Sequence, residues 1–432
     1  MQYLKMVNVR NRQDSTTLAS TPSVCSAHPD VLLASLLLAR QHGQVLLIEA
    51  TSNQVNQFGG YTGMQPADFI TYVHGICAKH GIARELVLFG GDHLGPQVWR
   101  DQSTEHAMKH ASDLVASYVK AGFNKIHLDC SEGCAGEPAQ VGDDVSAERA
   151  AILASVCEQV SHAPQNLSYI VGTEVPAPGG ARAEEGQMAV IPTSAANASR
   201  TIRCHRQAFE QHGLNAAWER VAALVVQPGL EFAPDSVHHF DLQSPDMLSG
   251  VLDDYAHLAF EAHSTDYQRP AVFAELARRH FTVLKVGPAL TFSYRQAIYA
   301  LDQMAGWLAP VETRTSVAAV MEVLMHDAPE HWRKHYSGNA QTLHLLRHFS
   351  YADRIRYYWG HPAARRAVQL LLQVLTPQPQ PMPALLAQFF SLAVIERADK
   401  IRSLGLHWAQ ALVLAEIQLA LQPYFLDPGT VR

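Results

Sequence analysis

The feature that most constrains this chain is a recurring short apolar run that ends in a polar residue. Eight such runs follow one another, at residues 23–28, 45–51, 86–93, 125–131, 167–175, 222–229, 257–264 and 281–287. Each run has the length and near-continuous apolarity of a strand that is buried on both faces, which is typical of a parallel sheet.

Segments with helical periodicity lie between most of these runs. In residues 66–80, Phe69, Val73 and Cys77 share one face, and Gly81 follows as a stop signal. The same pattern recurs at residues 106–121, 146–160, 194–212, 270–280 and 294–308. Strands that alternate with helices predict a parallel α/β fold, and a count of eight favours a closed TIM (β/α)₈ barrel. No Gly-x-Gly-x-x-Gly follows the first run, which argues against a dinucleotide-binding fold.

The pattern changes after about residue 310, where strand-like runs stop and helices are expected at 315–326, 342–359, 363–375, 385–403 and 407–421. We therefore predict a barrel over residues 1–310 and a helical C-terminal extension over 311–432, packed on the barrel. Within the extension, Arg354 and Arg356 precede three aromatic residues, Tyr357 to Trp359. These aromatic residues predict a core beneath an amphipathic helix, with an interface or a sugar contact as the alternative.

Composition excludes several classes of function. The net charge is −7 and no run of Lys or Arg forms a basic stripe, so no nucleic-acid partner is expected. No apolar stretch reaches the roughly 18 residues that a membrane helix needs, and the first 20 residues carry no apolar signal-peptide region. The six cysteines contain no Cys-x-x-Cys pair, which favours reduced thiols and a cytoplasmic location.

The carboxyl ends of the predicted strands are rich in polar residues, and in this fold the chemistry collects at these ends. The end residues are His28, Glu49, Asp92 with His93, Asp129, Glu174, Gln227, His263 and Lys285. Packing alone would tolerate small or apolar residues at most of these positions. The pattern therefore predicts that this rim is a working site or descends from one.

Acid–base and metal candidates stand among these end residues. In the motif from Gly90 to Pro96, the carboxylate of Asp92 suits an acid or base and the imidazole of His93 suits a divalent metal. The alternative is a turn in which Asp92 accepts backbone N–H groups. His263 is the expected second metal ligand and Asp129 the third.

Two further carboxylates, Glu49 and Glu174, are candidates for the catalytic group alongside Asp92. Asp129 and Glu174 could instead form a layer of salt bridges inside the barrel mouth. Two histidines and a carboxylate would suit Zn²⁺ with an open position for substrate, whereas Mn²⁺ or Mg²⁺ would suit a carboxylate-rich set.

Substrate contacts are expected on both sides of the rim. The loop 50–63 is rich in amides, and Asn53 and Gln54 suit hydrogen bonds to sugar hydroxyls, unless the amides only cap the barrel top. Gln227 is a further substrate-binding candidate. For a phosphate, Lys285 and the backbone amides after Gly287 are the main candidates. Arg182 and Arg203 are weaker ones.

Stretches along almost the whole chain resemble one known family. They include residues 23–29 (SVCSAHP), 48–63, 90–96, 125–129, 172–176, 225–229, 261–268, 284–292 and 353–359 (DRIRYYW). With these motifs the chain resembles the Z-type, non-catalytic subunit of D-tagatose 1,6-bisphosphate aldolase. The resemblance implies a class II aldolase-like barrel that takes part in galactitol or N-acetylgalactosamine catabolism. It also implies a partner, a separate catalytic aldolase subunit whose activity and stability this chain would support.

More distantly, three motifs are similar to class II aldolases themselves. The pair Asp92–His93 resembles their catalytic aspartate and metal-binding histidine, His263 stands where they place another ligand, and Glu174 where they carry a glutamate. The chain departs from them after His263, where Ser264 and Thr265 replace a glycine-rich phosphate loop. The eighth run also reads Lys-Val-Gly-Pro instead of Asn-x-Asp, and both differences fall where a second phosphate would be held.

Two functions remain open. The first is a component of D-tagatose-1,6-bisphosphate aldolase. The alternative is an enzyme in its own right, a metal-dependent D-tagatose 6-phosphate 4-epimerase that gives D-fructose 6-phosphate by retro-aldol chemistry and needs only one phosphate site. Asp92 or Glu174 would be its base, and a homo-oligomer is possible in either case. A kinase is poorly supported, since the sequence has no Gly-x-x-x-x-Gly-Lys loop.

Overall fold

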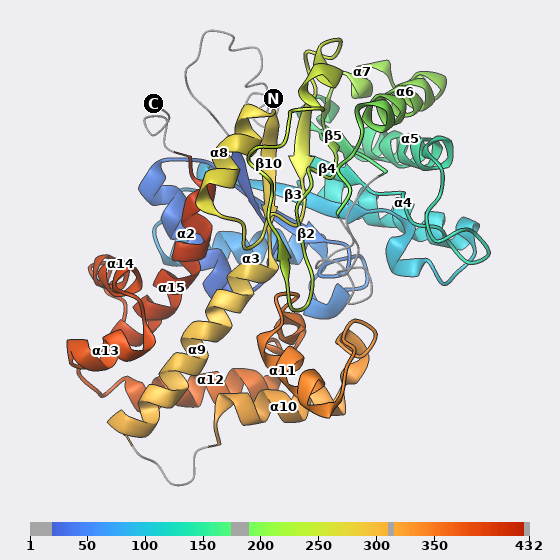
Figure 1. Ribbon diagram of the computed structural model, residues 1–432. Helices are drawn as coiled ribbons and strands as arrows, with labels where there is room; N and C mark the ends of the chain where they lie inside the picture. The colour runs from blue at the N-terminus through green and yellow to red at the C-terminus, as the bar shows by residue number, and fades with distance from the viewer. Residues whose placement is uncertain (1–19, 174–189, 310–314, 427–432) are drawn as a thin grey trace.

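The computed structural model describes residues 20–173, 190–309 and 315–426 (Figure 1). Its centre is a closed barrel of eight parallel strands in the order β1-β10-β9-β6-β5-β4-β3-β2. The strands are β1 (Thr21–Val24), β2 (Leu46–Thr51), β3 (Val87–Leu94), β4 (Lys125–Leu128), β5 (Ser168–Val171), β6 (Val221–Val225), β9 (Ala259–Ala262) and β10 (Phe281–Val286). The predicted (β/α)₈ barrel is therefore confirmed.

Helices surround the barrel and connect its strands. They are α2 (Pro29–His42), α3 (Pro66–Lys79), α4 (Thr104–Ala121), α5 (Asp143–Val160), α6 (Ala195–Gln211) with the short α7 (Asn215–Trp218), α8 (Pro270–Arg278) and α9 (Pro288–Leu308). The segment between β6 and β9 carries a small antiparallel ribbon, β7 (Glu231–Phe232) with β8 (Val237–His238). Within the described chain no helix is both long and apolar enough to cross a lipid bilayer.

The helices after residue 315 form the extension. They are α10 (Val317–Asp327), α11 (Ala340–Phe349), α12 (Pro362–Leu375), α13 (Pro383–Phe389), α14 (Leu392–Arg402) and α15 (Trp408–Leu421). Figure 1 shows α9 running away from the barrel towards α10 and α12, while α15 lies beside α2. Gln418 of α15 donates to the carbonyl of Ala34 in α2 over 3.0 Å. Covered by both the barrel and α15, α2 is buried throughout Val31–Ala39, which explains its apolar character on all sides.

Two helices predicted in the extension are each broken in the structure. Residues 342–359 divide into α11 and the 3₁₀ turn η9 (Arg354–Tyr358), because the extended backbone of Ser350 ends α11 and the left-handed backbone of Asp353, with φ 43°, precedes η9. Residues 385–403 divide into α13 and α14, because the hydroxyl of Ser391 accepts the N–H of Val394 and starts a new helix. Apolar periodicity alone does not locate such breaks, because it reports which residues are buried and not where the backbone turns.

The inward side of the barrel changes from apolar to charged along the strands. Leu47 precedes Glu49 by two residues on β2, Ala259 precedes Glu261 on β9, and Val283 precedes Lys285 on β10. Because side chains two apart share a face, each of these strands carries an apolar residue at one level and a charged residue at the next. The charged level lies directly beneath the carboxyl ends of the strands.

Candidate active site

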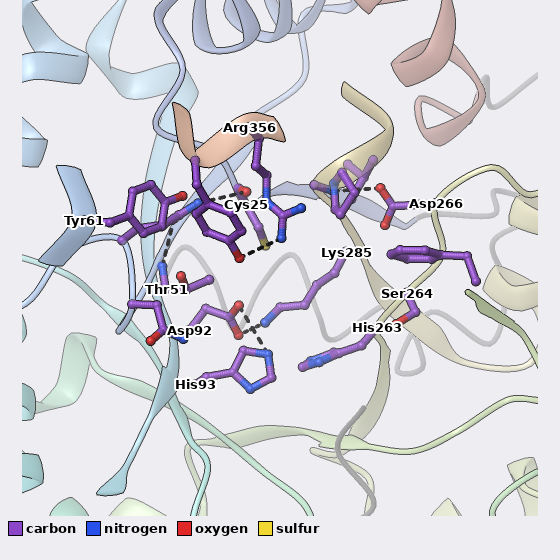
Figure 2. A pocket seen from close by; sticks show the side chains of 17 residues that line it. Cys25, Thr51, Tyr61, Asp92, His93, His263, Ser264, Asp266, Lys285 and Arg356 are labelled. Atoms are coloured by element: carbon purple, nitrogen blue, oxygen red, sulfur yellow. Dashed lines mark hydrogen bonds and ion pairs between the residues drawn. The ribbon is translucent and has the colours of Figure 1, made fainter. Parts of the chain in front are cut away.

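A pocket opens at the carboxyl ends of the strands (Figure 2). Its floor includes Asp92 and His93 of β3, His263 just after β9, and Lys285 of β10. Asn53, Gln54 and Tyr61 of the loop after β2 line one side, and Asp266 and Gly287 another. Arg356 and Tyr357 of η9 reach the same pocket from the C-terminal extension. The barrel rim and the extension thus share one site.

Three histidine rings form a triangle at the floor. The ring centroids of His93, His127 and His263 lie 5.1 Å, 5.2 Å and 5.2 Å from one another. All three side chains are buried. Burial, reinforced by neighbouring histidines, lowers the pKa of His127 to about 4 and lowers that of His263 well below its ordinary value. Both imidazoles are therefore neutral near pH 7, the form in which histidine binds a metal.

Each of the three rings has a carboxylate oxygen within hydrogen-bond distance. His93 Nδ1 lies 2.7 Å from Asp129 Oδ2, and the other oxygen of Asp129 accepts from the hydroxyl of Ser131 over 2.7 Å. His127 Nδ1 lies 3.0 Å from Asp92 Oδ1, and His263 Nε2 lies 3.0 Å from Glu261 Oε1. Asp129 therefore fixes the orientation of the His93 ring through Nδ1, which leaves Nε2 facing the other way. A carboxylate commonly orients a metal-binding histidine in this manner.

Asp92 is the carboxylate at the floor of the pocket. Its Oδ1 also contacts the ammonium of Lys285, and its Oδ2 lies 3.6 Å from His93 Nε2. The backbone here is in an unusual state, since His93 has φ 48° and Ser264, next to His263, has φ 54°. Left-handed residues other than glycine are uncommon and gather at functional sites.

A layer of buried charges supports the floor. Lys125 Nζ lies 2.8 Å from both oxygens of Glu49 and 2.9 Å from Glu261 Oε2. Burial raises the pKa of Glu49, but Lys125 and Lys285 outweigh burial and lower it to about 2. The pKa of Glu261 is raised, because burial is only partly offset by Lys125. Gly90 leaves the room for this layer, since a Cβ there would lie 2.8 Å from Glu49 Cγ.

The donor set at the floor fits a divalent metal. Ligand atoms of Asp92, His127 and His263 all lie within 4.8 Å of one another. His127 Nε2 is buried and forms no hydrogen bond with any residue that the structure describes, an unfavourable state that a bound cation would relieve. Nitrogen donors with one carboxylate suit Zn²⁺ best and leave Mn²⁺ possible.

The structure brings together most of the residues that the sequence singled out. Asp92, His93, His263, Lys285, Asn53, Gln54 and Gly287 line the pocket, while Glu49 and Asp129 lie buried directly behind it. Gln227 is not among the residues lining the pocket, and its Oε1 accepts the N–H groups of Gly229 and Leu230. Arg203 is exposed on α6. Glu174 and Arg182 lie outside the described residues.

Sequence reasoning missed His127, Lys125 and Glu261. A signal for them was present: Lys125, His127 and Asp129 alternate on β4 and its end, and Glu261 stands two residues before His263. Attention to strand ends alone overlooked the residue two positions earlier, which points to the same side. Arg356 belongs to the segment for which the sequence offered a sugar contact as the alternative, but only the folded extension brings it to the pocket.

Fold and site together define a class: a (β/α)₈ barrel that gathers histidines and carboxylates at the carboxyl ends of its strands, where barrel enzymes carry their active sites. Within that class, the chain belongs to the D-tagatose-1,6-bisphosphate aldolase subunit GatZ/KbaZ-like family, whose model matches residues 5–427. The resemblance drawn from the sequence motifs is thereby confirmed.

Two relatives carry more specific descriptions. A D-tagatose 6-phosphate 4-epimerase of Agrobacterium fabrum is 51% identical over 360 residues, which cover 83% of this chain and 84% of the relative. A crystal structure described as a probable tagatose 6 phosphate kinase from Sinorhizobium meliloti 1021 matches with a TM-score of 0.84 and 42% identity. That match covers 94% of this chain and 99% of the other.

Proposed function

We propose that this chain is a metal-dependent D-tagatose 6-phosphate 4-epimerase that forms D-fructose 6-phosphate by retro-aldol cleavage and re-addition. The observation that carries the proposal is the histidine triangle beside Asp92 at the floor of the pocket. The description of the Agrobacterium relative supports the choice of substrate. These two points favour the epimerase over the aldolase component.

The chemistry explains why this site suits the reaction. The two sugar phosphates differ at C4, which lies one carbon beyond the position that the C2 carbonyl acidifies. Simple proton exchange at C4 is therefore unfavourable, whereas breaking the C3–C4 bond places the electron pair next to the carbonyl. The aldehyde fragment can then rotate within the pocket, and re-addition of C3 to the opposite face of the aldehyde inverts C4.

Asp92 is the proposed base for the C4 hydroxyl. Its Oδ1 is held by Lys285 and by His127 Nδ1, so Oδ2 is the oxygen left to face a substrate. Asp92 would take the hydroxyl proton as the C3–C4 bond breaks and return it to the same oxygen after the bond forms again, so that protons balance over the cycle. Lys285 would keep the carboxylate ionised by its positive charge.

Ligand atoms of Asp92, His127 and His263 lie within 4.8 Å of one another. Because Asp92 is the proposed base, we assign His93 as the third metal ligand beside His127 and His263, with Asp129 orienting His93. A divalent cation bound there would stabilise the negative charge that develops on the ketose oxygens during cleavage. Zn²⁺ is the first choice, with Mn²⁺ and Mg²⁺ as alternatives.

The decisive experiment offers D-tagatose 6-phosphate to the purified chain after chelation and after reloading with Zn²⁺, Mn²⁺ or Mg²⁺. Fructose 6-phosphate should form only with metal. His263→Ala should lose both bound metal and activity, and Asp92→Asn should lower kcat by about 100-fold or more. A matched control is His162→Ala, an exposed histidine of the loop before β5, which should leave activity unchanged. A metal-loaded chain that makes no fructose 6-phosphate would overturn the proposal.

The second candidate is the aldolase component, which the family description favours. It predicts that the chain alone does not convert D-tagatose 6-phosphate and does not cleave D-tagatose 1,6-bisphosphate. Adding the chain to a catalytic aldolase subunit would then raise that subunit's thermal stability and turnover. The same purified protein therefore distinguishes the two functions.

A further inference from the structure

Two long cationic side chains, Lys285 and Arg356, reach the pocket, and they differ in whether carboxylates pair with them. Lys285 contacts Asp92 and lies 3.7 Å from Glu49 Oε2 and 3.4 Å from Glu261 Oε1. Its charge is already compensated by three carboxylates. Arg356, by contrast, forms no ion pair with any carboxylate of the residues that the structure describes. Arg356 is therefore the cation whose charge is available to a ligand.

Neutral groups hold the guanidinium of Arg356 in place. Nη1 donates to the carbonyls of Ala352 and Asp353, and Nη2 donates to the hydroxyl of Tyr357 over 3.0 Å. These acceptors fix the plane of the guanidinium without neutralising it. Figure 2 shows the group pointing into the pocket from the side opposite His93, with Lys285 between them. Tyr61 lines the same end, its ring centroid 4.9 Å from that of Tyr357.

The two nearby carboxylates are turned to other partners. Asp353 accepts from the hydroxyl of Thr291 over 2.6 Å and lies 3.4 Å from Arg295 Nε, both on α9. Asp266 accepts the N–H groups of Gly287 and Ala289 at the start of α9, over 3.0 Å and 2.8 Å. The contacts of Asp353 also tie η9 to α9, which follows β10 directly. Arg356 is thus presented by a segment anchored to the barrel.

We propose that Arg356 is the phosphate anchor of this site, so that the C-terminal extension binds the terminal phosphate of a ketose monophosphate whose reacting carbons lie at the histidines. The inference rests on the proposed function and specifies its substrate contact. A planar guanidinium matches two phosphate oxygens at once, which a lysine does not. The sequence had suggested Lys285 and the backbone amides after Gly287 instead, but Lys285 is paired with Asp92, and the N–H of Ala289 already donates to Asp266.

The test compares phosphorylated and free ketose in the metal-loaded enzyme. Arg356→Met should lower kcat/KM for D-tagatose 6-phosphate by about 10- to 100-fold, as expected for losing a charged hydrogen-bond pair, while any turnover of D-tagatose stays within about twofold. Arg356→Lys should recover part of the loss. The matched control is Arg366→Met, which removes an exposed arginine of the neighbouring α12 and should change neither value.

Binding measurements keep the anchor testable apart from the reaction. Titration calorimetry with inorganic phosphate and with D-fructose 6-phosphate should give a Kd at least about 10-fold weaker in Arg356→Met than in the unaltered chain. If the unaltered chain makes no fructose 6-phosphate, the proposed function is wrong. The comparison of Kd values between the unaltered chain and Arg356→Met still tests whether Arg356 binds phosphate. Equal Kd values, or equal losses on both ketoses, would overturn the anchor. If Arg356→Met does not fold, Arg356→Lys replaces it in the test. An unchanged KM of Arg356→Lys for the phosphorylated ketose would contradict the anchor. Where there is no turnover, an unchanged Kd for inorganic phosphate would contradict it instead.

Discussion

At the residue scale, the site depends on charges buried where water cannot screen them. Lys125, with a side chain only 1% exposed, lies between Glu49 and Glu261, both fully buried. Two carboxylates this close would repel each other without the ammonium between them. The layer therefore sets both the electrostatics of the pocket floor and the positions of the side chains above it.

Removing Lys125 should cost more than a surface ion pair. Lys125→Met removes the nearest cation from two buried carboxylates, which keep only the longer contacts with Lys285, so the free energy of unfolding should fall by about 3–5 kcal/mol. Urea denaturation followed by circular dichroism measures the change. In the control, Arg206→Met removes the exposed pair with Glu210 on α6 and should cost about 0.5 kcal/mol or less. A similar small cost for both variants would show that the layer is not needed for stability.

At the scale of elements, the mouth of the barrel depends on how closely β3 approaches β4. A Cβ on Gly95 would lie 1.7 Å from the backbone oxygen of Asp129, a distance that no relaxation of a side chain can relieve. Gly95 has an extended backbone, so its need for glycine comes from crowding and not from its φ. The turn after β3 therefore holds the end of β4, and with it Asp129 behind His93.

Two glycine substitutions should have opposite effects. Gly95→Ala should lower the free energy of unfolding by several kcal/mol, within the range of about 1–4 kcal/mol seen for strain and overpacking, and should abolish metal binding by displacing Asp129. Gly75 lies in the middle of α3, where an added Cβ would meet no described atom outside its own stretch of helix within 4 Å, so Gly75→Ala should raise stability by about 0.5–1 kcal/mol. Thermal denaturation of the pair checks both signs. A well-folded, metal-binding Gly95→Ala protein would refute the crowding argument.

At the scale of the whole molecule, the extension is built into the barrel mouth. Besides η9, Tyr424 near the end of the described chain donates its hydroxyl to the carbonyl of Thr265 over 2.9 Å. Thr265 in turn donates to the carbonyl of Lys285 over 2.6 Å. A division between barrel and extension near residue 310 stays a prediction. These contacts indicate that residues on both sides of it form one site.

The pH dependence of global stability should include a contribution from Asp266 at this junction. Burial raises its pKa from 3.8 to about 6, despite two backbone N–H donors. The folded state therefore binds a proton more readily than the unfolded state. The resulting stability is fully present below about pH 4 and is lost as pH rises through 6. A shift of about two units corresponds to at most about 3 kcal/mol.

Asp266→Asn cannot titrate and isolates this contribution. The difference in unfolding free energy between the unaltered chain and Asp266→Asn, measured with urea at pH 4 and pH 7, should favour the unaltered chain more strongly at pH 4. The amide oxygen can still accept the N–H groups that cap α9, so the variant should fold. A difference that is the same at both pH values would contradict the raised pKa.

The sequence by itself determined the barrel. Buried parallel strands need apolar residues on both faces and end at polar positions. This pattern is local and repeats eight times, so it is recognisable without any knowledge of which strands are neighbours. The strand ends also pointed to Asp92, His93 and His263, because in this fold the carboxyl ends of all strands meet at one rim. The family motifs were local for the same reason.

Only the tertiary structure decided which residues meet. Glu49, Lys125 and Glu261 come from three strands, and their pairing depends on the register and closure of the barrel, which no local pattern encodes. Arg356 lies 71 residues beyond Lys285 in the chain, yet both reach the same pocket because the extension folds back onto α9. Burial, which sets the protonation of His127 and His263, likewise arises only when distant segments pack together.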